Sequence, residues 1–180
     1  MSPSTPLTEA AGIEVPLLCG AIFHGSNPEL VAAETEDGGL GIVQPLSLTG
    51  VHGHVFREGL RLIRRLTSKP MGMNALIEES SRTYRLRMER WIDIALEEGV
   101  RFFVTSLGNP RWVVDRVRPS GGVVYHDVTE RRWAVKGIEG GVDGLIAVND
   151  RAGGHAGNRT AETLVEELGD LGLPLVCAGG

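Results

Sequence analysis

The chain has 180 residues, of which 42% are hydrophobic and 23% charged, and its formal net charge at pH 7 is −5. This balance is typical of a globular protein with a core of its own, and it excludes a disordered chain. The acidic charge argues against a nucleic-acid partner, which would need a basic patch. No apolar stretch approaches the roughly 18 residues that span a bilayer, so we expect no membrane partner.

The cysteine content and the N-terminus indicate the compartment. Cys19 and Cys177 are the only cysteines, and they form neither a disulfide framework nor a zinc-binding spacing. The first residues lack the charged start and apolar run of a signal peptide. A reducing compartment is the simplest context for such a chain, so we expect a cytoplasmic protein.

Short apolar runs alternate with helix-like segments along the chain. The sequence predicts strands, bounded mainly by glycine, proline or polar residues, over residues 15–20, 40–43, 71–74, 100–105, 123–126, 142–148 and 173–178. It predicts helices over residues 28–37, 55–66, 81–98, 110–117, 129–138 and 160–171. Residues 44–54 are expected to form a loop rich in glycine and histidine.

This alternation predicts repeated βα units and a parallel sheet, and the apolar strands indicate burial on both faces. Seven strands are one fewer than in a (β/α)8 barrel, a fold that typically takes about 250 residues. We therefore predict an α/β fold of the (β/α)8 TIM-barrel type, truncated after strand seven. The alternative is an open doubly wound sheet that is complete at this length. No linker divides residues 1–180, so we expect one domain.

The segment GVDGLIAVNDRAGGHAG, at 141–157, is the strongest candidate for chemistry. Gly153 and Gly154 follow a buried strand and let the backbone turn close to a ligand. They deliver His155 to the carboxyl end of that strand, where ligands bind in α/β folds. A histidine can transfer a proton near neutral pH, because its unperturbed pKa is about 6.5.

Other strand ends supply weaker candidates. Gly179 and Gly180 follow strand seven, where barrels commonly bind phosphate. Gly20-Ala21-Ile22 ends the first strand with mostly small residues that a flat ring can approach, and Asn74 could hold the polar edge of a ligand. His126 could line the same cavity. The His52/His54 pair lacks a third ligand, so we predict no metal site.

Five segments occur in a recognisable order along the whole chain: PLLCGAIF, EDGGLGIV, KPMGMN, GVDGLIAVNDRAGGHAG and LPLVCAGG. Together they resemble the nitronate monooxygenase family, once called 2-nitropropane dioxygenase, which is related to FMN-dependent enoyl-ACP reductases. The most specific part is AGGHAG. The chain departs from the family pattern at Val148, where many members have glutamine, and at Arg151, where many have glutamate. Some members have a basic residue near Asp127.

The resemblance implies an FMN-binding barrel with FMN as its cofactor and His155 as its catalytic base. It also implies that the FMN-binding residues are Gly20, Ala21, Ile22, Asn74, Gly153, Gly154, Gly179 and Gly180. The implied activity is oxidation of alkyl nitronates by molecular oxygen. We also expect that the chain can form a homo-oligomer. Two alternatives stay open: an NAD(P)H-dependent flavin reductase of enoyl thioesters or quinones, and a non-catalytic barrel fragment that binds a phosphate ligand.

Overall fold

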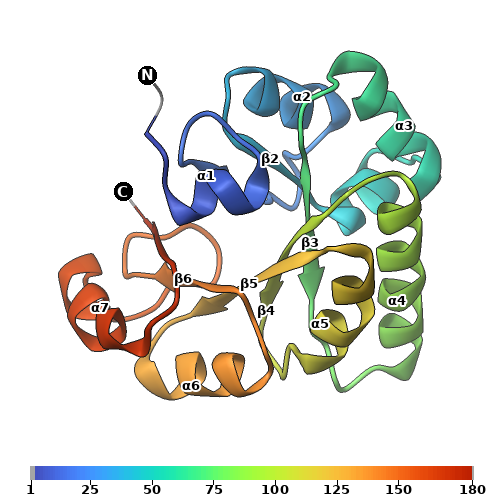
Figure 1. Cartoon of the computed structure of the whole chain (residues 1–180). Helices are drawn as coiled ribbons and strands as arrows, with labels where there is room; N and C mark the ends of the chain where they lie inside the picture. The colour runs from blue at the N-terminus through green and yellow to red at the C-terminus, as the bar shows by residue number, and fades with distance from the viewer. Residues whose placement is uncertain (1–2, 180) are drawn as a thin grey trace.

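The computed structural model describes residues 3–179, which form one parallel sheet covered by helices (Figure 1). The strands are β1 (Leu18–Cys19), β2 (Leu40–Val43), β3 (Gly72–Leu76), β4 (Phe102–Ser106), β5 (Val123–Val128), β6 (Gly144–Val148) and β7 (Leu175–Ala178). The α-helices are α1 (Pro6–Ala11), α2 (Pro28–Glu36), α3 (Phe56–Leu66), α4 (Arg82–Glu97), α5 (Arg111–Val117), α6 (Arg131–Glu139) and α7 (Ala161–Leu168).

The strand order in the sheet is β1-β2-β3-β4-β5-β6-β7, and every neighbouring pair is parallel. This confirms the prediction of a TIM-barrel type of fold and excludes a doubly wound sheet, whose strand order would reverse near its middle. In Figure 1 the helices α2 to α7 follow an arc outside the strands. The strands curl as part of a barrel, open between β7 and β1.

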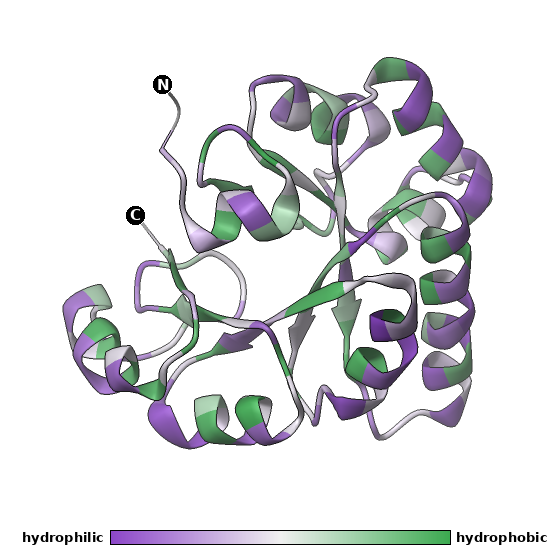
Figure 2. Ribbon diagram, in the orientation of Figure 1, coloured by the Kyte–Doolittle hydropathy of each residue, from purple (hydrophilic) through white to green (hydrophobic). Residues whose placement is uncertain are grey.

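Alternate residues on each strand face two different cores. One core lies between the sheet and the outer helices and contains Met73, Phe103, Val124 and Leu145. The other lies on the barrel interior, where Ile42, Phe102, Val104, Tyr125, Ile146 and Val148 cluster with residues of α1. Figure 2 shows hydrophobic residues along the strands and both hydrophobic and hydrophilic stripes on the helices. The two cores explain why the strands read as continuous apolar runs.

Helix α1 is absent from the elements predicted above. It begins with a capping box in which Thr5 and Thr8 bond to each other's backbone N–H. Its Leu7 and Ala11 side chains pack into the interior core. At the end of α1, Gly12 lies near Pro70, which precedes β3. Helix α1 therefore covers the amino-terminal end of the barrel interior.

The remaining predicted elements are present with shifted ends. Strand β2 and the carboxyl end of α3 lie where predicted, whereas β1 has only two residues instead of six. The segment predicted as a loop at 44–54 contains a π-helical turn, Ser47–Val51, which buries Leu48. Most shifts are of one or two residues, as expected for boundaries inferred from periodicity.

Candidate functional site

Because all seven strands are parallel, the loops that follow them meet at one edge of the sheet. Most predicted site residues lie in these loops: 20–22 after β1, 153–155 after β6 and Gly179 after β7. Asn74 is the middle residue of β3, because that strand continues to Leu76 and does not end at residue 74 as predicted. The structure therefore brings the loop residues to the same edge, and Asn74 lies within the sheet, two residues before the end of β3. Gly180 lies outside the described residues.

Asn149, directly after β6, organises this edge. Its side-chain Nδ2 donates to the carbonyl oxygen of Gly179 at 2.7 Å, and its Oδ1 accepts from the backbone N–H of Arg151 at 2.8 Å. Its backbone carbonyl accepts from the N–H groups of Ala152 and Gly157. This buried asparagine thus ties the β6–α7 loop to the end of β7. In the sequence, Asn149 was visible only as a polar residue at the end of a predicted strand. Its hydrogen-bond partner, Gly179, lies 30 residues further along the chain, so the sequence did not reveal this contact.

The close contact between Asn149 and Gly179 requires glycine at position 179. Its φ is +106°, and a Cβ there would lie 2.1 Å from Oδ1 of Asn149 and 2.6 Å from the backbone nitrogen of Ala152. Any other residue would push the loop away from β7. Gly179, one of the two residues predicted to bind phosphate, therefore fixes the junction between the loop after β6 and the end of β7.

The loop that Asn149 holds carries His155. Gly154 has a φ of +73°, and its carbonyl accepts from the N–H of Ala156 in a tight turn. A Cβ at Gly153 or Gly154 would meet no atom within 4 Å, so the backbone here is open to an approaching ligand. His155 is exposed at the rim of the carboxyl edge. A base in this place can reach a substrate from solvent.

The loop after β1 presents backbone and apolar surface. Gly20 is open, because a Cβ there would meet no atom within 4 Å. Ala21 packs against the interior core. The N–H of Ile22 already donates to the hydroxyl of Ser26 at 2.9 Å. The side chains of Ile22 and Phe23 are 56% and 49% exposed, which leaves an apolar surface at the rim.

Asn74 and His126 lie on opposite sides of the sheet. Asn74 alternates with Met73 and Ala75, which face the helices, so its partly exposed amide faces the barrel interior. His126 faces outward: a Cβ on Gly137 of α6 would lie 3.0 Å from its Cδ2. The prediction that His126 could line the cavity is therefore wrong.

His126 is a neutral core residue. It is 3% exposed, and its Nδ1 lies 2.9 Å from the hydroxyl oxygen of Thr105. Burial lowers its pKa to about 4, against the smaller opposing effect of a hydrogen bond with the backbone of Thr105. At neutral pH it has no charge to offer a ligand.

Asp127 is the interior-facing residue that sequence reasoning missed. It follows Tyr125 by two positions on β5, and Tyr125 belongs to the interior core. Burial raises the pKa of its carboxyl to about 7, although the residue as a whole stays partly exposed. The sequence of β5 is VVYHDV, which does not alternate between apolar and polar residues. The pattern therefore did not indicate whether His126 or Asp127 faces the barrel interior.

The arrangement fits a flavin mononucleotide. Open glycine backbone at 20, 153 and 154 lets a flat ring approach, and the exposed side chains of Ile22 and Phe23 supply apolar contact. The Asn74 amide can bond to the polar edge of the ring. The junction at Gly179 can place backbone near a phosphate.

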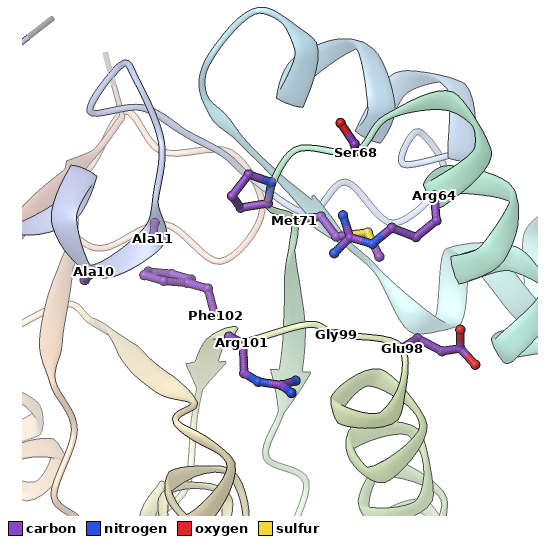
Figure 3. A pocket seen from close by; sticks show the side chains of 10 residues that line it. Ala10, Ala11, Arg64, Ser68, Met71, Glu98, Gly99, Arg101 and Phe102 are labelled. Atoms are coloured by element: carbon purple, nitrogen blue, oxygen red, sulfur yellow. The ribbon is translucent and has the colours of Figure 1, made fainter.

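The opposite end of the barrel has a cavity of about 590 Å3. It is lined by Ala10 and Ala11 of α1, Arg64 and residues that precede or begin β3 and β4. Figure 3 shows Phe102 beside Ala10 and Ala11, with Arg64 reaching toward Met71. In barrels this amino-terminal face serves stability. We therefore place the candidate site at the carboxyl edge. Within residues 3–179 no helix has both the length and the apolarity to cross a membrane.

Known proteins resemble this chain over almost its whole length. A curated relative from Rhodococcus jostii, "(3aS,4S,5R,7aS)-5-hydroxy-7a-methyl-1-oxo-octahydro-1H-indene-4-carboxyl-CoA dehydrogenase", is 28% identical over 98% of this chain and 48% of its own. The nitronate monooxygenase of Pseudomonas aeruginosa is 25% identical over 96% of this chain and 61% of its own. The structure of FabK (M276A mutant) from Thermotoga maritima superposes with a TM-score of 0.81 and 27% identity, over 98% of this chain and 57% of that one.

The chain thus spans between about half and three fifths of the length of these relatives. The TM-score confirms the barrel type of fold. The family model for nitronate monooxygenase matches residues 4–180. The chain therefore belongs to the nitronate monooxygenase family.

Proposed function

We propose that residues 1–180 form the FMN-binding barrel part of an oxidoreductase that oxidises alkyl nitronates with molecular oxygen. The observation that carries this proposal is the Gly153–His155 loop, tied by Asn149 to the end of β7, in a chain of the nitronate monooxygenase family. Bound FMN would supply the electron transfer, and the protein would position both reactants.

The predicted residues have separate roles in this proposal, with Gly153 and Gly154 shaping the pocket and Ile22 contacting the flavin beside them. Asn74 holds the polar edge of the flavin from the barrel interior, while the backbone at Gly20 and Ala21 lies against the ring. The junction at Gly179, with Gly180, binds the phosphate. His155 removes the proton from the carbon beside a nitro group, or binds the nitronate once that proton is lost.

A second candidate is a flavin enzyme that oxidises or reduces a thioester. It is favoured by the relative from Rhodococcus jostii, whose name describes a dehydrogenase of a carboxyl-CoA compound. This second candidate would use the same flavin site and the same loops after β1, β6 and β7 as the first, and only the substrate would differ.

An absorption spectrum of the purified full-length protein tests both candidates. FMN bands near stoichiometric amounts are expected, and a colourless protein that takes up no added FMN would reject both. Oxygen consumption with propane-2-nitronate supports the first candidate. Bleaching of the flavin by NAD(P)H or by a hydroxyacyl-CoA, without oxygen consumption on nitronate, supports the second and rejects the first.

A further inference from the structure

Asp127 has no role in the proposed function, yet its surroundings are unusual for a carboxyl group. On β5 the residues on either side of it contribute to the outer layer, where Val128 packs in the helix-facing core and His126 contacts α6. The Asp127 side chain therefore projects into the barrel interior. It lies two positions nearer the carboxyl edge than Tyr125.

The neighbours of Asp127 on the sheet carry no charge. Asp127 is in register with Ile146 of β6, and the pairing of Thr105 with His126 places Ser106 of β4 beside it. The interior face of β4, β5 and β6 holds one other titratable side chain, Tyr125, whose buried hydroxyl has no partner. Burial is the sole cause of the raised Asp127 pKa, so no ion pair stabilises the carboxylate.

The fold gains nothing from this carboxyl. A carboxylate that is largely withdrawn from water and has no partner destabilises a folded protein, whereas an apolar residue would suit the interior core that contains Val104 and Ile146. A carboxyl with a perturbed pKa, at the edge where barrels bind ligands, is typical of a functional site. An acid kept neutral by apolar walls can donate a hydrogen bond to a negatively charged oxygen.

We propose that the neutral carboxyl of Asp127 donates a hydrogen bond to the anionic oxygen of a ligand bound in the barrel interior. The ligand class is a small organic anion whose charge lies on oxygen: a nitronate, or the enolate form of a thioester. Asp127 lies near the carboxyl end of β5, and His155 lies in the exposed loop after β6. This inference rests on the proposed function for the identity of the substrate, but the binding step needs no turnover.

The test uses 2-methylpropanoate, a carboxylate that resembles propane-2-nitronate and cannot be oxidised in its place. Its dissociation constant is measured on FMN-loaded protein from the change in the flavin spectrum, at pH 6 and pH 8. The His155→Ala background is used, so that the imidazole adds no pH dependence. Because the anion binds the protonated carboxyl, its affinity should fall about tenfold between the two pH values.

Two substitutions and one control decide the outcome. Asp127→Asn keeps a donor and should bind equally at both pH values. Asp127→Leu removes the donor and should bind at least fivefold more weakly at pH 6. Asp150→Asn removes a carboxyl from the exposed end of the same edge and should behave as its parent. An unchanged pH dependence in Asp127→Asn, or unchanged affinity in Asp127→Leu, overturns the proposal.

The proposal is separable from the proposed function. If the protein takes up no FMN, the proposed function fails, and the same anion is titrated against FMN-free protein while the Asp127 carboxyl is followed by carbon NMR. The anion should raise the titration midpoint of Asp127. A midpoint that does not move overturns the role of Asp127 by itself.

Discussion

His126 and Asp127 are consecutive residues on β5 whose side chains lie on opposite faces of the sheet and whose pKa values are shifted in opposite directions. Burial lowers the pKa of His126 to about 4 and raises that of Asp127 to about 7. Both shifts have one cause, because burial disfavours the charged form of either group. The pair makes the stability of the fold depend on pH in two opposing ways.

The pKa of His126 is about 6.5 in the unfolded chain and lower in the folded protein. Its contribution to the stability of the fold is therefore complete above about pH 6.5 and is lost as the pH falls toward 4. The shift corresponds to about 3 kcal/mol at 1.36 kcal/mol per unit. We expect His126→Gln to flatten the loss of stability in acid, although its absolute stability at pH 7 falls through poorer packing. Urea unfolding at pH 4.5 and 6.5 measures the change. A slope as steep as in the parent would contradict it.

The carboxyl group of Asp127 changes the stability of the fold with pH in the opposite direction. Its folded pKa lies above its unfolded value, so its contribution is present below about pH 4 and is lost as the pH rises toward 7. Because the side chain is partly open to water, the effect should be smaller than the full shift. We expect Asp127→Asn to be more stable than the parent at pH 7.5, by about 1–2 kcal/mol, and equal to it near pH 4. A variant that is less stable at both pH values would show that the carboxylate has a partner.

Gly179→Ala tests the junction between the loops after β6 and β7. The new Cβ would overlap Oδ1 of Asn149 in a backbone conformation with positive φ. We expect a loss of about 1–3 kcal/mol in the free energy of unfolding and weaker binding of FMN. Gly153→Ala is the matched control, since its Cβ meets open space. Thermal unfolding of the two variants should differ clearly, and equal stability would remove the close contact as the reason for glycine.

His155→Ala tests the proposed base in FMN-loaded protein. We expect unchanged FMN content and turnover of a neutral nitroalkane slowed by about 10²–10⁴, the usual contribution of general base catalysis. A preformed nitronate has already lost its proton, so its oxidation should suffer less. His24→Ala, an exposed histidine after β1, is the control. Equal losses on both substrates would leave His155 as a binding residue at most.

The open edge of the sheet predicts self-association of the 180-residue chain. The exposed fractions of Val15 and Leu17, beside the short strand β1, are 42% and 55%. Unpaired strand edges of this kind recruit other chains. We expect sedimentation to detect dimers or larger species that Leu17→Lys reduces, whereas Leu86→Lys, on exposed α4 surface, leaves them unchanged. A chain that is monomeric throughout would refute this.

The sequence was sufficient for the strand order, because apolar strands that alternate with helices admit few arrangements. It was insufficient for α1, whose six residues are too few for a periodic signal and are held by their cap and by the interior core. It also could not orient His126 and Asp127, since both are polar and the packing of His126 against Gly137 of α6 joins two separate elements. The role of Asn149 depends on Gly179, a contact that local patterns do not encode.

The strictly sequential strand order also bears on how the protein is made. Each new strand pairs with the one synthesised just before it, so a chain leaving the ribosome can extend its sheet strand by strand from the N-terminus. Helix α1, which precedes every strand of this sheet, is ready to cover the interior as soon as β2 and β4 present Ile42 and Phe102. The growing sheet has two unpaired edges, one at β1 and one at the newest strand, so chaperones that shield such edges would act while each of these strands is added.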